Sequence, residues 1–244
     1  NTTTVNLSGS TQTEGASASY IFTATLSQAS QGTTTIVTDQ GTITITDGNT
    51  VGTLTLTANN AEDVYLDGSS LTATITSATG GNFENLVVGT AAATAVVNDT
   101  INPTTVTLNN VSVDEGTGTA TIGASLDHAP TAGPVVLTLS NGSTVTFTVG
   151  YTPGDIVQST PFAVQGDDVY LDGESYSVSI SSYTGGTEFE NLVTTDTATV
   201  TVNNTINPTT IILDGSTSNV TGQITLTAQV DHAPLTTNLV ITLT

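Results

Sequence analysis

Apolar and polar residues alternate along most of the chain. The clearest stretches are YIFTATL at residues 20–26, TITIT at residues 42–46 and LTL at residues 54–56. Alternation with abundant Thr, Val and Ile is typical of β-strands that have one buried face. The pattern predicts seven strands in the first repeat, at about residues 3–8, 17–26, 33–38, 42–46, 51–57, 70–77 and 91–98. No stretch of useful length has the periodicity of a helix.

Four motifs return after about one hundred residues. They are INPTT at residues 101–105 and 206–210, DVYLDG at 63–68 and 168–173, FENLV at 83–87 and 189–193, and DHAP at 127–130 and 231–234. Repeats of this length are whole domains, because about a hundred residues can bury a core of their own. We therefore predict three units, at residues 1–102, 103–207 and 208–244.

Seven short strands in about a hundred residues predict an all-β fold of tandem immunoglobulin-like antiparallel β-sandwich domains. The Cys and Trp of antibody domains are absent from the sequence, so no disulfide closes these sandwiches. Residues 208–244 have room for three strands only, and three strands cannot close a two-sheet core. Either the chain is cut within this unit, which we expect, or a neighbouring molecule donates the missing strands.

The charge of the chain excludes several classes of partner. It carries 21 Asp and Glu residues but neither Lys nor Arg, which gives a formal net charge of -21. Binding to nucleic acid or to an anionic membrane surface needs Lys and Arg. No apolar run approaches the roughly 20 residues that cross a bilayer, and no signal peptide opens the chain. We therefore expect no nucleic-acid partner and no membrane insertion.

Acidic residues fall where the immunoglobulin topology brings separate loops together. If the predicted strands are lettered A to G, the AB, CD and EF loops and the end of strand G lie at the same end of the sandwich. In the first unit this end carries Glu14, Asp39, Glu62, Asp63, Asp67 and Asp99. In the second unit it carries Asp114, Glu115, Asp167, Asp168, Asp172, Asn203 and Asn204.

Crowded carboxylates without a basic neighbour repel one another unless a proton or a cation neutralises them. An all-oxygen set of donors suits Ca²⁺, whereas Zn²⁺ prefers His or Cys, and the only histidines are His128 and His232. The linker at residues 100–103 is too short for free swinging, so loops of the next unit should face this end. Those loops carry Asp127, Asp155, Glu188 and Glu190. We therefore predict Ca²⁺ sites at the junctions that stiffen the string of domains.

The pattern of acids is similar to a known family. Glu-Gly before strand B, an acidic pair with a third acid after strand E, and Asn-Asp at the end of strand G resemble the Calx-β pattern. EDVYLDG at residues 62–68 and TGGNFENLV at residues 79–87 resemble the extender repeats of giant bacterial RTX-type adhesins. The resemblance implies type I secretion, a location at the bacterial cell surface, and Ca²⁺-stiffened repeats that project an adhesive tip for attachment or biofilm formation.

The same resemblance implies the metal ligands. They are Glu14, Glu62, Asp63, Asp67 and Asp99 in the first unit and Glu115, Asp167, Asp168 and Asp172 in the second. To these we add Asp127 from a facing loop and Asn204, which stands where the pattern has an acid but can still ligate through its carbonyl oxygen.

Some residues fit functions other than a structural one. Glu188 and Glu190 are spaced like a glycosidase pair, but the first repeat keeps only Glu84, so we expect no enzyme. The recurring histidines beside Pro are interpreted as loop-ordering residues. Two alternatives to a stalk remain: the repeats themselves bind carbohydrate, or they assemble into an extracellular filament by strand exchange through the incomplete third unit.

Overall fold

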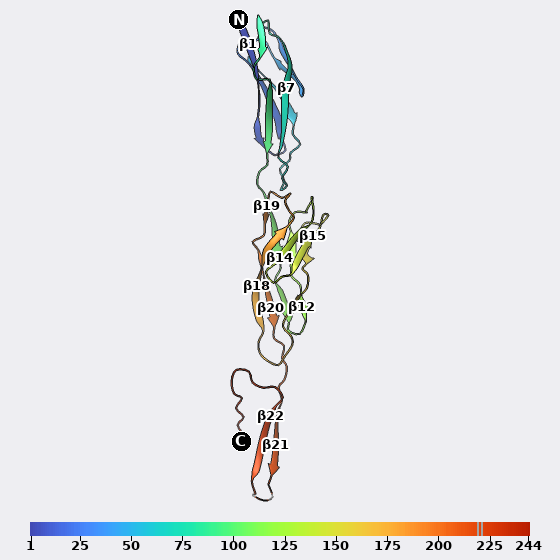
Figure 1. The fold of residues 1–244 in the computed structure, drawn as a ribbon, viewed down its shortest axis with the longest axis vertical. Helices are drawn as coiled ribbons and strands as arrows, with labels where there is room; N and C mark the ends of the chain where they lie inside the picture. The colour runs from blue at the N-terminus through green and yellow to red at the C-terminus, as the bar shows by residue number, and fades with distance from the viewer. Residues whose placement is uncertain (219, 221) are drawn as a thin grey trace. The chain divides into compact units, whose positions relative to one another are not determined.

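The computed structural model describes residues 1–218, 220 and 222–244, and it confirms the all-β fold of tandem β-sandwiches. No helix occurs among these described residues. Figure 1 shows the strands along the chain, coloured from blue at the N-terminus to red at the C-terminus. The chain divides into two compact units. The first contains Asn1–Thr105 together with Gly186–Val193, and the second contains Val106–Gly185 together with Thr194–Thr244.

The first unit is built from two sheets. Its strands are β1 (Thr2–Gly9), β2 (Thr11–Thr13), β3 (Ser19–Leu26), β4 (Thr34–Thr38), β5 (Gly41–Ile45), β6 (Val51–Thr57), β7 (Ser69–Gly80), β8 (Asn85–Val88) and β9 (Ala92–Asn98). One sheet has the order β6-β3-β1-β8 and the other the order β2-β9-β7-β4-β5. All seven predicted strands are present, and their bounds agree within a few residues.

The apolar positions of both sheets meet in one core. Val5 of β1, Phe22 of β3, Ile36 of β4 and Ile43 of β5 are fully buried in it. The alternation in the sequence places these side chains on one face of each strand, because successive side chains of a strand point to opposite faces. Burial of each large apolar side chain stabilises the fold by about 1.5–3 kcal/mol.

Two short strands of this unit were not predicted. β2 runs parallel to β9, and β8 runs parallel to β1 with Thr2 opposite Asn85 and Val5 opposite Val88. β8 contains the second half of the FENLV motif. In the second repeat the same motif forms β19 (Asn191–Val193), which pairs in parallel with the first three residues of β10 (Pro103–Leu108). The repeated motif therefore provides an edge strand beside the first strand of each repeat.

The second unit repeats the two-sheet plan. Its strands include β11 (Val111–Asp114), β12 (Thr119–Ala120), β13 (Gly123–Leu126), β14 (Val135–Leu139), β15 (Thr144–Phe147), β16 (Val157–Gln158), β17 (Phe162–Ala163), β18 (Glu174–Thr184) and β20 (Thr197–Asn203). One sheet has the order β11-β20-β18-β14-β15, and in the other β13 lies between β16 and the second half of β10. Ile122, Leu126, Leu137 and Phe147 are fully buried.

Residues 208–244 form a hairpin of β21 (Ile211–Thr217) and β22 (Ile224–Val230). The prediction of a third strand here is wrong, because residues 231–244 contain no strand. A strand needs a hydrogen-bonded neighbour, and the alternating stretch at residues 239–244 pairs with no other described strand. Among the described residues, no helix is long and apolar enough to span a membrane.

Candidate metal centre

Three separate segments of the first unit meet at one end of its sandwich. The amide of Glu14, in the loop after β2, donates to the carbonyl of Asn98 at the end of β9 at 2.9 Å. The amide of Gly15 donates to the carbonyl of Asn60, in the loop between β6 and β7, at 3.0 Å. These backbone hydrogen bonds fix the loops to each other, so their acidic side chains are held close together.

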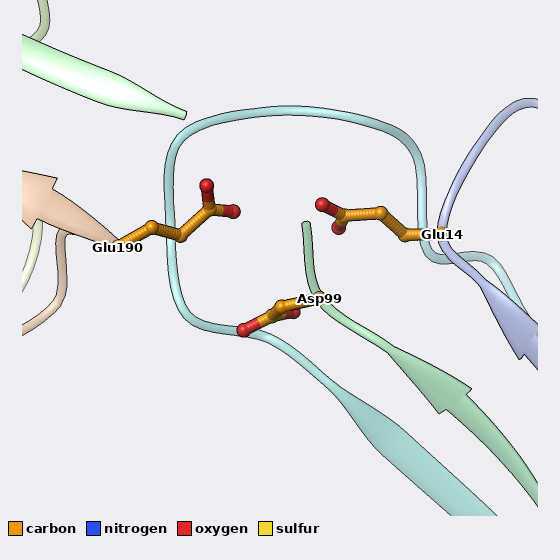
Figure 2. A group of neighbouring side chains, drawn as sticks. All are labelled: Glu14, Asp99 and Glu190. Carbon is orange, nitrogen blue, oxygen red and sulfur yellow. The ribbon is translucent and has the colours of Figure 1, made fainter. Parts of the chain in front are cut away.

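Glu14, Asp99 and Glu190 form the first acidic cluster. One carboxylate oxygen of each lies within 4.8 Å of the other two. Figure 2 shows the three carboxylates pointing toward one another. Glu190 comes from the segment Gly186–Val193 of the second repeat, which belongs to the first compact unit. The amide of Glu190 donates to the carbonyl of Val64 at 3.0 Å, so the backbone positions this third carboxylate.

The carboxylate of Glu14 is the most buried of the three, with 6% of the residue exposed. Its Oε1 accepts hydrogen bonds from the amide and the hydroxyl of Thr100, at 3.0 and 2.8 Å. Its Oε2 is buried and accepts no hydrogen bond. Glu190 has the same arrangement, because Oε2 accepts from the amide of Asn102 while Oε1 is buried without a donor. An ionised oxygen left this way costs free energy unless a cation or a proton lies against it.

The hydroxyl of Thr100 shows the same shortage of positive charge. It lies 2.8 Å from Glu14 Oε1 and 2.6 Å from Glu62 Oε1. A hydroxyl has one proton, so it can donate to only one of these two carboxylates at a time. The hydroxyl oxygen of Thr100 then faces the other carboxylate oxygen with no hydrogen between them, and the two oxygens repel. A cation or a further proton would relieve this repulsion.

Glu62 and Asn102 tie the linker to the cluster. The side-chain amide of Asn102 donates to Glu62 Oε1 at 2.5 Å and to the carbonyl of Asp63 at 2.9 Å. Hydrogen bonds from Thr100 and then from Asn102 lower the pKa of Glu62 below its ordinary value. Glu62 is therefore held in its ionised form.

Asp63 and Asp67 shape the loop that leads into β7. Asp63 Oδ1 accepts from the amide of Tyr65 at 2.7 Å, and Asp99 Oδ1 accepts from the amide of Asp67 at 3.1 Å. Loss of hydration raises the pKa of Asp67, and the charges of Asp63 and Glu14 raise it further. The pKa of Glu190 is raised for the same first reason, with the charges of Glu14, Asp99 and Asp63 adding to it. In both residues the negative charge of the ionised carboxylate is therefore only partly compensated by its surroundings.

The second unit contains an equivalent acidic cluster of Glu115, Asp168 and Asp172, again with one oxygen of each within 4.8 Å of the others. Glu115 is 4% exposed, its Oε1 accepts from the amide and hydroxyl of Thr205, and its Oε2 is buried without a hydrogen bond. The Thr205 hydroxyl again lies between two carboxylates, at 3.0 Å from Glu115 and 2.6 Å from Asp167. Loss of hydration and the charges of Asp168 and Glu115 raise the pKa of Asp172.

Asn204 takes the place of Asp99 in this second cluster. Its Oδ1 accepts from the amide of Asp172 at 2.9 Å, the same role that Asp99 Oδ1 has toward Asp67. Its other polar atom is an amide nitrogen, which donates to the carbonyl of Thr205 and cannot ligate a cation. The carbonyl oxygen that we expect to ligate the metal accepts this one hydrogen bond, from Asp172, and keeps a second lone pair.

Asp39 and Asp127 are two of the acids named from the sequence that lie outside both clusters. Asp39 accepts from the amide of Thr74 at 2.8 Å, five residues into β7, and not at the end of the sandwich where we placed it. It binds there because β4 ends at Thr38, which pairs with Ile75 in the middle of β7. Asp127, assigned as a ligand, belongs to the second unit and contacts the ring of the adjacent His128 at 2.9 Å.

Glu190 is the residue missing from our ligand set. The sequence named it among the acids of facing loops but did not single it out. The sequence feature that could have identified it is its position in the repeated FENLV motif, directly before the edge strand β19. Phe189 of the same motif stacks on Tyr65, with ring centroids 5.5 Å apart. The motif therefore anchors the segment through Phe189 and presents the carboxylate of the next residue.

The atoms of both clusters that could ligate a metal are carboxylate oxygens, with carbonyl and hydroxyl oxygens beside them. This set fits Ca²⁺, which takes 6–8 hard oxygen ligands in flexible geometry. It does not fit metals that select thiolate or imidazole, because the sequence has no Cys and neither His belongs to a cluster. The buried oxygens of Glu14 and Glu115 accept no hydrogen bond, so a cation in either cluster would have an unoccupied carboxylate oxygen to bind.

Fold and site together define a class: a tandem β-sandwich protein with an acidic cluster at the end of each complete repeat. The LapA domain family matches residues 1–100 and again residues 102–205. The chain therefore belongs to the LapA domain family, which is related to bacterial adhesins. Membership supports an adhesin-related role and a location at the cell surface or outside the cell.

The other comparisons add little. No curated protein matches the chain. A solved structure of a two-domain protein with unknown function from Bacteroides fragilis is similar at 9% identity, covering 83% of this chain and 93% of that one, with a TM-score of 0.28.

Proposed function

We propose that these repeats form a calcium-stiffened stalk of a bacterial surface adhesin and project an adhesive tip away from the cell for attachment or biofilm formation. In this proposal Ca²⁺ binds both acidic clusters, and the repeats have no catalytic activity of their own. The family relation supports the adhesin part of the proposal. The acidic clusters support the calcium part.

One observation carries the proposal. Glu14 has a buried carboxylate oxygen without a hydrogen-bond donor, and it lies within 4.8 Å of carboxylate oxygens of Asp99 and Glu190. The chain has no Lys or Arg that could neutralise this charge. A bound cation removes the repulsion, because opposite charge stabilises the ionised form of closely spaced carboxylates.

The origin of the three carboxylates explains how an ion would stiffen the chain. Glu14 and Asp99 belong to the first match of the family, at residues 1–100, and Glu190 belongs to the second, at residues 102–205. An ion bound to all three would join residues of both repeats. It would therefore oppose separation of the segment Gly186–Val193 from the first repeat.

Small-angle scattering of the chain in calcium and in chelator tests the proposal, with equilibrium dialysis as the measure of bound ion. We expect bound calcium and a larger, better-defined maximum dimension in its presence. A matched control carries Glu14→Gln and Glu115→Gln, which remove both buried carboxylates at nearly constant shape. The proposal fails if the parent chain binds no calcium, or if its dimension is the same in calcium and in chelator.

A second candidate, assembly through residues 208–244, is favoured by one observation. The hairpin of β21 and β22 exposes large apolar side chains, among them Ile212 at 57%, Ile224 at 71% and Leu226 at 53%. A second molecule could cover them by adding strands, as in strand donation. Light scattering over a range of concentrations tests this: a growing mass supports assembly, and a constant monomer mass contradicts it.

A further inference from the structure

A chain of hydrogen bonds leads from the core of the first unit to its acidic cluster. The hydroxyl of Tyr20 donates to Ser69 Oγ at 2.7 Å, and the hydroxyl of Ser69 donates to Asn60 Oδ1 at 2.7 Å. The side-chain amide of Asn60 then donates to the carbonyl of Asp67 at 2.6 Å and to Asp67 Oδ1 at 3.2 Å. From there the amide of Asp67 donates to Asp99 Oδ1, as described above. We call Tyr20, Ser69 and Asn60 the relay.

The hydrogen bonds of the relay can run in one direction only, from the hydroxyl of Tyr20 as first donor to Asp67 as last acceptor. Asp67 presents two oxygens to the end of Asn60, so that end must be the nitrogen, because two facing oxygens would repel. The oxygen of Asn60 then faces Ser69, whose hydroxyl donates to it and accepts from Tyr20. Every donor along the relay therefore has an acceptor, and the Asn60 amide cannot rotate without losing three hydrogen bonds.

Both ends of the relay are fixed in space. The ring of Tyr20 packs against the hydrophobic core, so the core sets the position of its hydroxyl. Asn60 is buried, with 6% exposed, and its carbonyl accepts from the amide of Gly15 beside Glu14. The exposed loop around Asp67 is therefore connected to rigid parts of the fold without help from a metal.

The second repeat keeps only the last link of the relay. Register identifies the equivalent residues: Ser69 lies opposite Val97 in the first unit, and Glu174 lies opposite Val202 in the second. Val5 lies opposite Leu26 and Val106 opposite Leu126, so Ala120 stands where Tyr20 stands. Ala120 has no hydroxyl, and Glu174 brings another negative charge. Gln165 stands where Asn60 stands and its side chain hydrogen-bonds to Asp172, so the second repeat keeps this last link but lacks the two hydroxyls that connect it to the core.

We propose that Tyr20, Ser69 and Asn60 are positioning residues that hold Asp67 and Asp99 for cation binding, so that the first cluster is preformed and binds calcium more tightly than the second. The inference rests on the proposed calcium function and assigns part of its control to residues that do not touch the ion. Outer-shell hydrogen bonds of this kind fix the orientation of ligands and commonly change metal affinity 10–100-fold. A preformed site also avoids the entropic cost of ordering its loop when the ion binds.

The test compares Ser69→Ala, Ser69→Thr and Asn60→Ala in a chain that also carries Glu115→Gln, which disables the second cluster. Calcium titration is expected to show affinity about ten-fold weaker for Asn60→Ala and several-fold weaker for Ser69→Ala. Ser69→Thr keeps the hydroxyl and should restore the parent affinity. If Asn60→Ala fails to fold, as judged by circular dichroism, Tyr20→Phe replaces it because it removes only the first donor.

A second readout does not need the ion. Hydrogen exchange of the Asp67 amide in metal-free protein should be faster in Ser69→Ala than in the parent, and normal in Ser69→Thr. Tyr151→Phe is the control, because it removes a hydroxyl bonded to Leu126 and Asp155 in the other unit and should change neither readout. Unchanged affinity and unchanged exchange in Ser69→Ala would overturn the relay. A parent chain that binds no calcium would instead overturn the proposed function.

Discussion

Asp99 Oδ1 accepts a hydrogen bond from the backbone amide of Asp67, 3.1 Å away and 32 residues earlier in the chain. Asp99 has a second carboxylate oxygen, and one of its two oxygens lies in the cluster with Glu14 and Glu190. Asn204 makes the same bond to Asp172 but has a nitrogen in place of that second oxygen. The two repeats therefore share a loop geometry but differ in the number of carboxylate oxygens at this position, and the consequence can be measured.

Exchange of these two residues should change the calcium affinities in opposite directions. Asp99→Asn removes one negative ligand from the first cluster and should weaken its binding, whereas Asn204→Asp should strengthen binding at the second. The loop bond to the backbone amide survives in both variants, because each side chain keeps one acceptor oxygen. Isothermal titration calorimetry measures the effect, and we expect about ten-fold or more in each case, since the charge of the ligands tunes Ca²⁺ affinity. Equal affinities for parent and variants would show that these positions are not ligands.

Glu14→Gln should stabilise the metal-free protein and remove its response to calcium at the first cluster. Glutamine provides an NH₂ group where Glu14 has a buried oxygen without a donor. Relief of such a group is worth about 1–3 kcal/mol, and each kcal/mol raises Tm by about 4–8 °C in a domain of this size. Scanning calorimetry with chelator and with calcium measures both effects.

The parent protein provides the comparison for that experiment. A cation that binds only the folded state stabilises it by about 2.7 kcal/mol at a hundred times its Kd. The calcium-dependent rise in Tm should be large in the parent and mostly absent when Glu14→Gln is combined with Glu115→Gln. A double variant that responds to calcium like the parent would contradict the assignment of both clusters.

Metal-free protein should become more stable as pH falls toward the range where its carboxyls protonate. The folded-state pKa values of Glu190 and Asp67 are raised above the ordinary values of 4.5 and 3.8. Between the ordinary and the raised value the folded state binds more protons than the unfolded chain, so stability falls as pH rises through this window. Thermal unfolding in chelator from pH 7 downward measures the effect, and Glu190→Gln should reduce it.

With calcium bound, or at still lower pH, the stability of the folded protein should instead fall as pH falls. Ca²⁺ needs ionised ligands, so its affinity should fall over the same window as the carboxyls protonate. The pKa of Glu62 is lowered, so the stability it contributes is present above its ordinary value of 4.5 and lost as pH falls through its folded-state pKa. A metal-free protein whose stability rises steadily with pH from 4 to 7 would contradict the crowding of the cluster.

Phe189→Ala should weaken the attachment of Glu190 to the first cluster. Phe189 is 4% exposed and stacks on Tyr65, and the flanking backbone bonds join Leu66 to Glu188 at 2.8 Å and Glu190 to Val64 at 3.0 Å. Loss of a buried Phe side chain costs about 3 kcal/mol. Hydrogen exchange at the amides of Leu66 and Glu190 should therefore be faster in the variant, and calcium should slow it in the parent.

The control for this prediction is Tyr183→Phe, which changes an aromatic residue of β18 that is 46% exposed. It should leave exchange at both amides unchanged. Slow exchange of the Glu190 amide in Phe189→Ala would show that the stacked ring does not hold this segment in place.

The sequence alone determined the strands and the repeat, and it predicted the kind of chemistry. Alternation is a property of residues that are neighbours in the chain, so the seven strands of the first repeat could be predicted within a few residues. The absence of Lys and Arg beside 21 acids indicated a cation without any coordinates. The short strands β2 and β8 escaped prediction, because their pairing partners lie 83 or more residues away and their own pattern is weak.

Only the tertiary structure decided which acids meet. Glu190 reaches the cluster because the edge strand after it pairs with β10, and its bond to the amide of Asn102 spans 88 residues. The single proton of Thr100 between two carboxylates, and the relay from Tyr20 to Asp67, likewise depend on distances across the fold. Local patterns fix the face on which a side chain lies, but the approach of two charges to within a few ångströms depends on how distant segments pair.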